Sequence, residues 1–178
     1  MSDLAKDIRD LAQRRHLPDA HLERWLNLDE ANRKAVFEAA TTLKLRTGQM
    51  AAALDLIEEI CVREKTDATA LLSRPALRRL FDSAGSAPQR AAQFLDELRA
   101  IRYPRLRAMT QRLEKAVAAM RLPREIAVVL PRDLASDELT IQLKVADARG
   151  LERVLQVLSE KRSELYSILS AMGGGDEI

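Results

Sequence analysis

Residue types that build most catalytic and metal sites are scarce in this chain of 178 residues. It contains one cysteine, two histidines and six aromatic residues. Cys61 has no intrachain disulfide partner, and it continues the apolar side of a helical pattern, so we expect a buried small side chain. His16 and His21 lack the companion Cys or His residues of a metal site, and surface or capping roles are expected. We predict a non-enzymatic protein without a metal or cofactor.

Long uncharged apolar runs are also missing. No stretch reaches the 18 or so uncharged apolar residues that a membrane span needs. The opening MSDLAKDIRD carries charges where a secretory signal needs an apolar run, and a lone cysteine agrees with a reducing compartment. The triple glycine at 173–175 follows a helical pattern, whereas a phosphate-binding loop precedes one. These features predict a cytoplasmic protein with no membrane partner and no small-molecule substrate.

The first 82 residues are dominated by apolar residues at helical spacing. With 47% hydrophobic and 31% charged residues, the composition is that of a folded globular chain. Leu, Val, Ile and Ala must fill the core because aromatics are few. Residues that favour N-caps divide this part into short helices, the expected caps being Asp29, Thr47, Asp67 and Ser73. Residues 1–82 are therefore predicted to form an all-α domain.

A cluster of small residues, Gly and Pro at 83–88 is the predicted linker. Ser86 and Gln89 fit a capping box that opens the next helix. That helix is expected to end near Tyr103, because the residue before a proline is disfavoured in the α conformation. Pro104 then suits the first turn of a further helix.

Beyond Pro123 the apolar period changes from 3.6 to 2. The runs 126–130 and 139–145 predict an antiparallel hairpin, and Asp147 is expected to cap one long final helix. Residues 89–172 are thus an expected αββα domain, followed by a flexible tail at 173–178. The predicted fold class is mainly α with a small α+β C-terminal unit: an N-terminal bundle of short helices, then helix, β-hairpin and helix.

An isolated hairpin is marginally stable in water, and its outer strand can pair with another chain. The αββα domain is therefore predicted to form a homodimer. The apolar residues assigned to the dimer interface are Leu139, Ile141, Leu143, Leu155 and Leu165.

Basic residues concentrate between positions 99 and 124. This segment has a net charge of +7, whereas the whole chain has +2 and the remaining residues together have −5. One interpretation is contact with nucleic-acid phosphates, which suits a segment rich in arginine. The other is a solvated helix face whose cations pair with acids elsewhere in the chain. The candidate contact residues are Arg99, Arg102, Tyr103, Arg105, Arg107, Arg112, Lys115, Arg121 and Arg124.

A second candidate for nucleic-acid contact is the turn 45–49, which separates two expected helices. A short turn containing Gly between helices is typical of a helix-turn-helix. The helix that would enter the groove carries Asp55, Glu58 and Glu59, which phosphates would repel. This pattern disfavours DNA recognition at the turn.

The order of these segments resembles the region that follows the helix-turn-helix in ParB/Spo0J-like (partition-protein-like) bacterial proteins. The resemblance rests on LxLxxxQ at 43–49, IEEI at 57–60, the segment 73–80, and above all RYPRL at 102–106 with Leu-Pro before the hairpin. Two features depart from the pattern. The Gly-Glu-Arg-Arg type motif of the nuclease-like domain is missing, and VVLPRDLASDE stands where an aromatic, Gly-containing turn is typical.

The resemblance implies association with DNA or with a DNA-bound protein partner, as a dimer, and carries over no nuclease activity. The leading hypothesis is a DNA-associated accessory protein of partition or regulatory type that contacts phosphates through segment 99–124. The alternative is a protein–protein interaction adaptor or dimeric scaffold without nucleic-acid contact.

Overall fold

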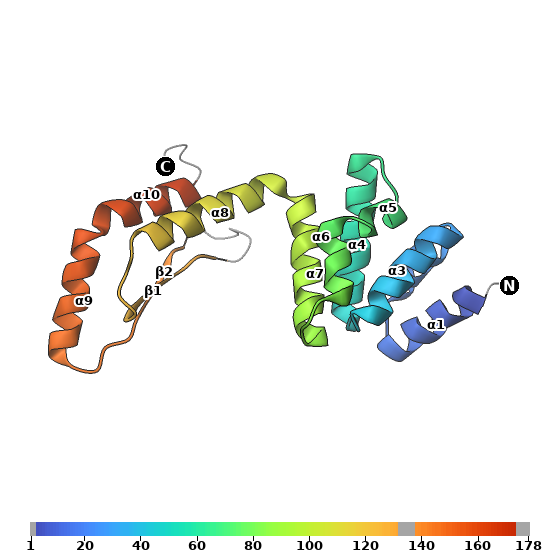
Figure 1. Cartoon of the computed structure of the whole chain (residues 1–178), viewed down its shortest axis with the longest axis horizontal. Coiled ribbons are helices and arrows are strands. Elements are labelled where there is room, and N and C mark those ends of the chain that lie inside the picture. The colour runs from blue at the N-terminus through green and yellow to red at the C-terminus, as the bar shows by residue number, and fades with distance from the viewer. Residues whose placement is uncertain (1–2, 132–137, 174–178) are drawn as a thin grey trace. The chain divides into compact units, whose positions relative to one another are not determined.

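The computed structural model describes residues 3–131 and 138–173 (Figure 1). The described chain is mostly helical, with a small two-stranded antiparallel sheet. It divides into two compact units, Met1–Tyr103 and Pro104–Ile178. The coarse fold class expected from the sequence, mainly α with a small β element, is confirmed.

The first unit consists of seven helices in its described part. They are α1 (Asp3–Arg15), α2 (Asp19–Leu26), α3 (Glu30–Thr42), α4 (Thr47–Glu64), α5 (Ala68–Leu72), α6 (Pro75–Asp82) and α7 (Ala87–Arg102). Their buried side chains form one core, which includes Trp25, Leu43, Ile60, Leu77 and Phe94. Aliphatic residues supply most of this core, as the composition predicts.

Local capping explains where several of these helices begin. Asp29 accepts a hydrogen bond from the Asn32 amide at 2.9 Å, and Asp67 accepts one from Ala70 at 2.7 Å. Ser86 and Gln89 form the expected capping box at the start of α7. These interactions satisfy amide groups that the first helical turn leaves without partners.

Two expected caps are corrected. Arg46, not Thr47, is the N-cap of α4, and the Thr47 hydroxyl instead donates to the carbonyl of Arg15. Ser73 closes α5 by donating to the Thr69 carbonyl at 2.7 Å, while Arg74 is the N-cap of α6. In both cases the expected residue bonds to an earlier carbonyl, and the N-cap is the adjacent residue.

The boundary between the units differs from the predicted linker at 83–88. That segment joins α6 to α7 within the first unit, and α7 packs with α4 and α6. Phe94 and Leu98 have no exposed surface and belong to the first core. A helix that buries such side chains on the N-terminal bundle cannot start an independent domain, and the boundary falls at Tyr103–Pro104.

The second unit contains α8 (Pro104–Ala119), β1 (Ile126–Val129), β2 (Thr140–Leu143), α9 (Ala148–Glu160) and α10 (Arg162–Met172). α8 packs with α10, and Leu113 and Ile168 are central in their shared core. Asp147 caps α9 by accepting from the Gly150 amide at 2.6 Å. Residues 132–137 of the hairpin connection, and the predicted tail apart from Gly173, lie outside the described residues.

The strands pair antiparallel, with Ile126 opposite Leu143 and Val128 opposite Ile141. These four apolar side chains lie on one face of the sheet, because directly paired residues share a face. Ile126 is buried, whereas Ile141 and Leu143 on the outer strand are 37% and 39% exposed. The predicted half-buried strand is thus more open than expected, because the second core covers Val128 and Leu139 but does not include Ile141 or Leu143.

The single long final helix is corrected to two helices that meet at Lys161. Lys161 and Arg162 interrupt the apolar stripe between Leu158 and Leu165, so a straight helix would bring charge to the core. α10 buries its apolar side, but α9 buries only Val154. Leu155 on α9 remains 52% exposed.

Residues assigned to a dimer interface occupy three different environments. Ile141, Leu143 and Leu155 are exposed, and Leu139 is partly buried against the second core. Leu165 is only 8% exposed within its own chain, so it is corrected from an interface residue to a core residue. Among the described residues, no helix is long and apolar enough to cross a membrane.

Leu165 and Leu155 provide a matched test of the second core. Leu165→Ala is expected to lower the free energy of unfolding by about 2–5 kcal/mol, because it leaves a cavity among buried neighbours. Leu155→Ala is expected to change it by about 0.5 kcal/mol or less, because this side chain is half exposed. Urea denaturation of both variants measures the difference, and equal losses would contradict the assigned burial.

Candidate nucleic-acid interface

The unit boundary divides the nine candidate contact residues. Arg99, Arg102 and Tyr103 belong to the end of the first unit, and the other six belong to the second. Each group is therefore considered against the acids of its own unit.

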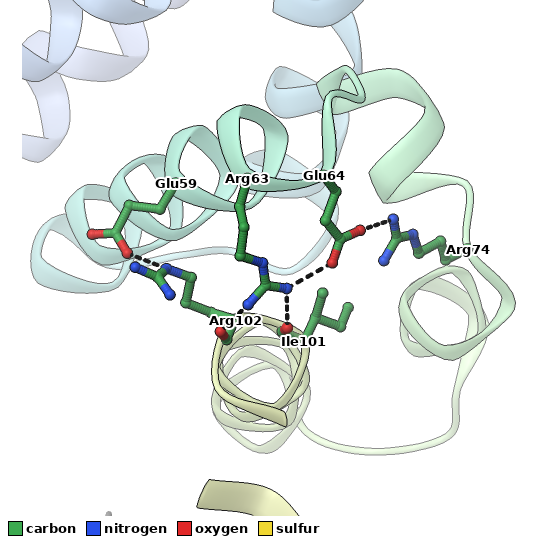
Figure 2. A network of polar contacts seen from close by, with 6 residues as sticks. All are labelled: Glu59, Arg63, Glu64, Arg74, Ile101 and Arg102. Atoms are coloured by element: carbon green, nitrogen blue, oxygen red, sulfur yellow. Dashed lines mark hydrogen bonds and ion pairs between the residues drawn. The ribbon is translucent and has the colours of Figure 1, made fainter. Parts of the chain in front are cut away.

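The C-terminal end of α7 is held by a side chain from α4 (Figure 2). The Arg63 guanidinium donates to the carbonyl of Ile101 at 2.6 Å and to the carbonyl of Arg102. These carbonyls lack helical partners because α7 ends at Arg102, two positions before Pro104. Arg63 thus caps α7 across the first unit, a role that local sequence spacing does not indicate.

Both α7 arginines among the candidates are paired with carboxylates. Arg102 donates from Nε to Oε2 of Glu59 at 2.6 Å, also drawn in Figure 2. Its guanidinium carbon lies 4.8 Å from the centre of the Tyr103 ring, in cation–π contact. Arg99 pairs with Asp96 at 3.0 Å. This group matches the interpretation in which basic residues pair with the chain's own acids.

Glu64 extends the same network toward α6. Its carboxylate accepts from Arg74 and from Arg63, and these bonds lower the pKa of Glu64 below its usual value. The acid therefore holds Arg63 in position while Arg63 caps α7. Figure 2 shows these residues joined in one chain of contacts.

The basic residues of α8 are in a different environment. Arg105, Arg107, Arg112 and Lys115 are all exposed, while Leu113 points into the second core. Arg105, Arg112 and Lys115 have no carboxylate within 4.0 Å among the described residues. At 100° per residue these three positions fall within about 80° of arc. They form one flank of α8, here called the α8 basic flank.

Two more candidates follow α8. Arg121 adopts the left-handed conformation, with φ 49°, directly after the helix. Arg121 and Arg124 are exposed and, in the described part of the chain, have no ion pair. Five exposed cations of the second unit are thus available to an anionic partner.

The acids that disfavoured a helix-turn-helix at 45–49 bind arginines of the first unit. Arg24 pairs with Asp55 at 2.6 Å and with Glu58 at 2.7 Å. Burial raises the pKa of Asp55, but hydrogen bonds from Arg24 and His21 outweigh it and the net pKa is lowered. Because Asp55 and Glu58 bind Arg24 of α2, and Glu59 binds Arg102 of α7, the acids of α4 are engaged within their own unit.

Candidate reactive residues are dispersed in the first unit. Cys61 is partly buried against the core, and burial raises the pKa of its thiol. Nε2 of His21 lies 3.3 Å from the Asp55 carboxylate. Within residues 3–131 and 138–173, no three His, Cys, Asp or Glu residues form a group able to hold a metal ion.

The α7 cap should depend on pH through Glu64. Glu64→Gln is expected to destabilise the protein above pH 4.5, where the wild-type acid is ionised in both folded and unfolded states. Because the folded-state pKa is the lower one, this difference is expected to shrink as pH falls below 4.5 through the folded-state pKa. Denaturation of both proteins across pH 3 to 7 (roughly the range in which carboxylates titrate) measures it. A pH-independent difference would contradict the ionic role.

Comparison with known proteins adds no assignment to these observations. No protein-family model, no curated protein and no solved structure matches the chain. The case for nucleic-acid contact is therefore built on the α8 basic flank and the sequence resemblance.

Proposed function

We propose that this chain is a non-enzymatic, DNA-associated accessory protein that binds nucleic-acid phosphates through the second unit. The proposed contacts are the α8 basic flank (Arg105, Arg112 and Lys115) together with Arg121 and Arg124. The observation that carries the proposal is that these five cations are exposed and have no carboxylate partner among the described residues. Together with the resemblance to bacterial partition-type proteins, DNA contact implies a cytoplasmic location.

The candidate cations of the two units differ in their partners. In the first unit, Arg102 gives its Nε–H to Glu59, and Arg99 faces Asp96. A phosphate would have to displace those carboxylates. At the α8 basic flank it would displace only water and counterions, which is the usual source of affinity for DNA.

The spacing of the flank suits a polyanion. Arg105 and Lys115 lie about 15 Å apart along the helix axis at 1.5 Å per residue. One DNA strand places about four phosphates over that distance at 3.4 Å each. Two of the three residues are arginines, and the guanidinium group can bind phosphate oxygens in a bidentate manner.

This interface is smaller than the sequence segment 99–124. Arg99 and Arg102 are left out because their carboxylate partners occupy them. Arg107 makes an interaction of its own and is not counted as a free contact. The partition or regulatory setting, and a DNA-bound protein as a further partner, come from the resemblance of the RYPRL segment alone.

Replacement of Arg105, Arg112 and Lys115 by Ala tests the interface. Binding to duplex DNA is expected to weaken for all sequences alike. The slope of log affinity against log salt is expected to fall in magnitude by about 0.9 for each lost phosphate contact. Fluorescence anisotropy with arbitrary duplex and single-stranded DNA, beginning at low salt, measures both.

A matched control removes the same charge from the first unit. Lys6, Arg14 and Lys34 are exposed and have no ion pair in the described chain, and their replacement by Ala should leave the salt slope unchanged. Equal weakening in both variants would mean that only net charge matters. Absence of binding by wild type at low salt would overturn the proposal and favour the adaptor alternative.

A further inference from the structure

The outer edge of β2 can pair with a second copy of itself. Among the described residues β2 has one neighbour, β1, in a two-stranded sheet. The Lys144 amide donates to the Glu125 carbonyl at 2.8 Å, so residues 144 and 125 form a hydrogen-bonded pair of the antiparallel ladder. Because such pairs alternate, the backbone groups of Ile141 and Leu143 point away from β1.

The outward-pointing groups restrict how two copies can pair. Antiparallel pairing requires that outward residues oppose outward residues, which leaves two compact registers. In one register, Ile141 opposes the second copy's Ile141, and Leu139 opposes its Leu143. In the other register, Ile141 opposes Leu143.

Charge selects between these registers. With Ile141 opposite Ile141, Glu138 of each copy lies opposite Lys144 of the other, and the contact occurs twice by symmetry. Glu138 also has an interaction within its own chain, which Lys144 of the second copy would join or replace. With Ile141 opposite Leu143, Lys144 lies opposite Thr140 and Glu138 opposite Ala146. Opposite charges on directly facing positions stabilise a sheet, so the first register is favoured.

We infer that the protein forms a homodimer in which two β2 strands pair antiparallel about Ile141, giving a four-stranded sheet. Ile141 and Leu143, now 37% and 39% exposed, would then lie opposite Ile141 and Leu139 of the second copy. The pairing would satisfy backbone groups at an apolar edge that has no strand partner among the described residues, and such an edge otherwise favours aggregation. The dimer contact involves neither DNA nor the α8 basic flank.

The symmetry has a consequence for the helices. Antiparallel neighbours in one sheet are related by a twofold axis perpendicular to the sheet, so both copies keep the same face on the same side. Residues of α8 and α10 pack in one core with Val128 and Leu139, on the apolar face of the sheet. The α8 helices of both copies would therefore lie on one side of the dimer.

Cysteine cross-linking tests the register in a Cys61→Ser background of the full chain. In the inferred register the two Ile141 Cα atoms are about 5.5 Å apart, within the range for a disulfide. The two Gln142 Cα atoms are roughly 7–8 Å apart on a diagonal. Ile141→Cys is expected to give a disulfide-linked dimer under mild oxidation, and Gln142→Cys is expected to give little.

Charge variants test the same contact without changing the apolar edge. Lys144→Glu would place an acid opposite Glu138 at both symmetry-related contacts. The dimer dissociation constant is therefore expected to rise roughly two- to thirtyfold. Adding Glu138→Lys to it should restore association. Sedimentation velocity measures the constants, and circular dichroism checks that each variant is folded.

Three results would overturn the inference. The first is a wild-type monomer at tens of micromolar. The second is preferential cross-linking through Gln142→Cys. The third is a dimer that is unaffected by Lys144→Glu and does not cross-link through Ile141→Cys, which would place the contact on another surface, such as the exposed Leu151 and Leu155 of α9.

Discussion

The proline at position 104 is the constraint on which the arrangement of charge depends. Proline has no amide hydrogen and disfavours helix at the residue before it, so α7 stops at Arg102 and a new helix begins at Pro104. The stop leaves carbonyls of α7 without helical partners, and Arg63 binds two of them. Glu59 then pairs with Arg102 beside this cap. A stretch that is continuous in sequence thereby contributes to two separate units.

That division changes what the local net charge means. In the first unit the candidate arginines Arg99 and Arg102 bind acids of the same unit. Beside them Glu64 binds two further arginines, and its lowered pKa is that of a carboxylate held in its ionised form. In the described part of the second unit, Arg153 pairs with Glu125 at 3.7 Å and Lys161 with Glu164 at 2.9 Å. Neither involves the α8 basic flank. The two interpretations of the basic segment are therefore not exclusive, because each suits one side of the boundary.

Features set by neighbouring residues could be predicted from the sequence, and features set by distant packing could not. The caps at Asp29 and Asp147 each depend on an amide three residues away. An aspartate before a helical pattern was therefore sufficient to place each helix start. The unit boundary depends on where Phe94 is buried, and the linker-like composition of 83–88 carries no information about that. The pairing of Arg102 depends on Glu59, which is 43 positions earlier. The α8 basic flank was predicted in composition, but its freedom from carboxylates is a tertiary property.

Mapping the backbone amides that respond to DNA by NMR tests the division of roles most directly. A ¹⁵N-labelled chain titrated with a short duplex at low salt is predicted to shift amides along α8 and through Arg121 and Arg124. Amides around Arg63 and Arg102 are predicted to remain unchanged, because their side chains stay bound to Glu64 and Glu59. Shifts concentrated at the end of α7 with α8 unaffected would contradict the account.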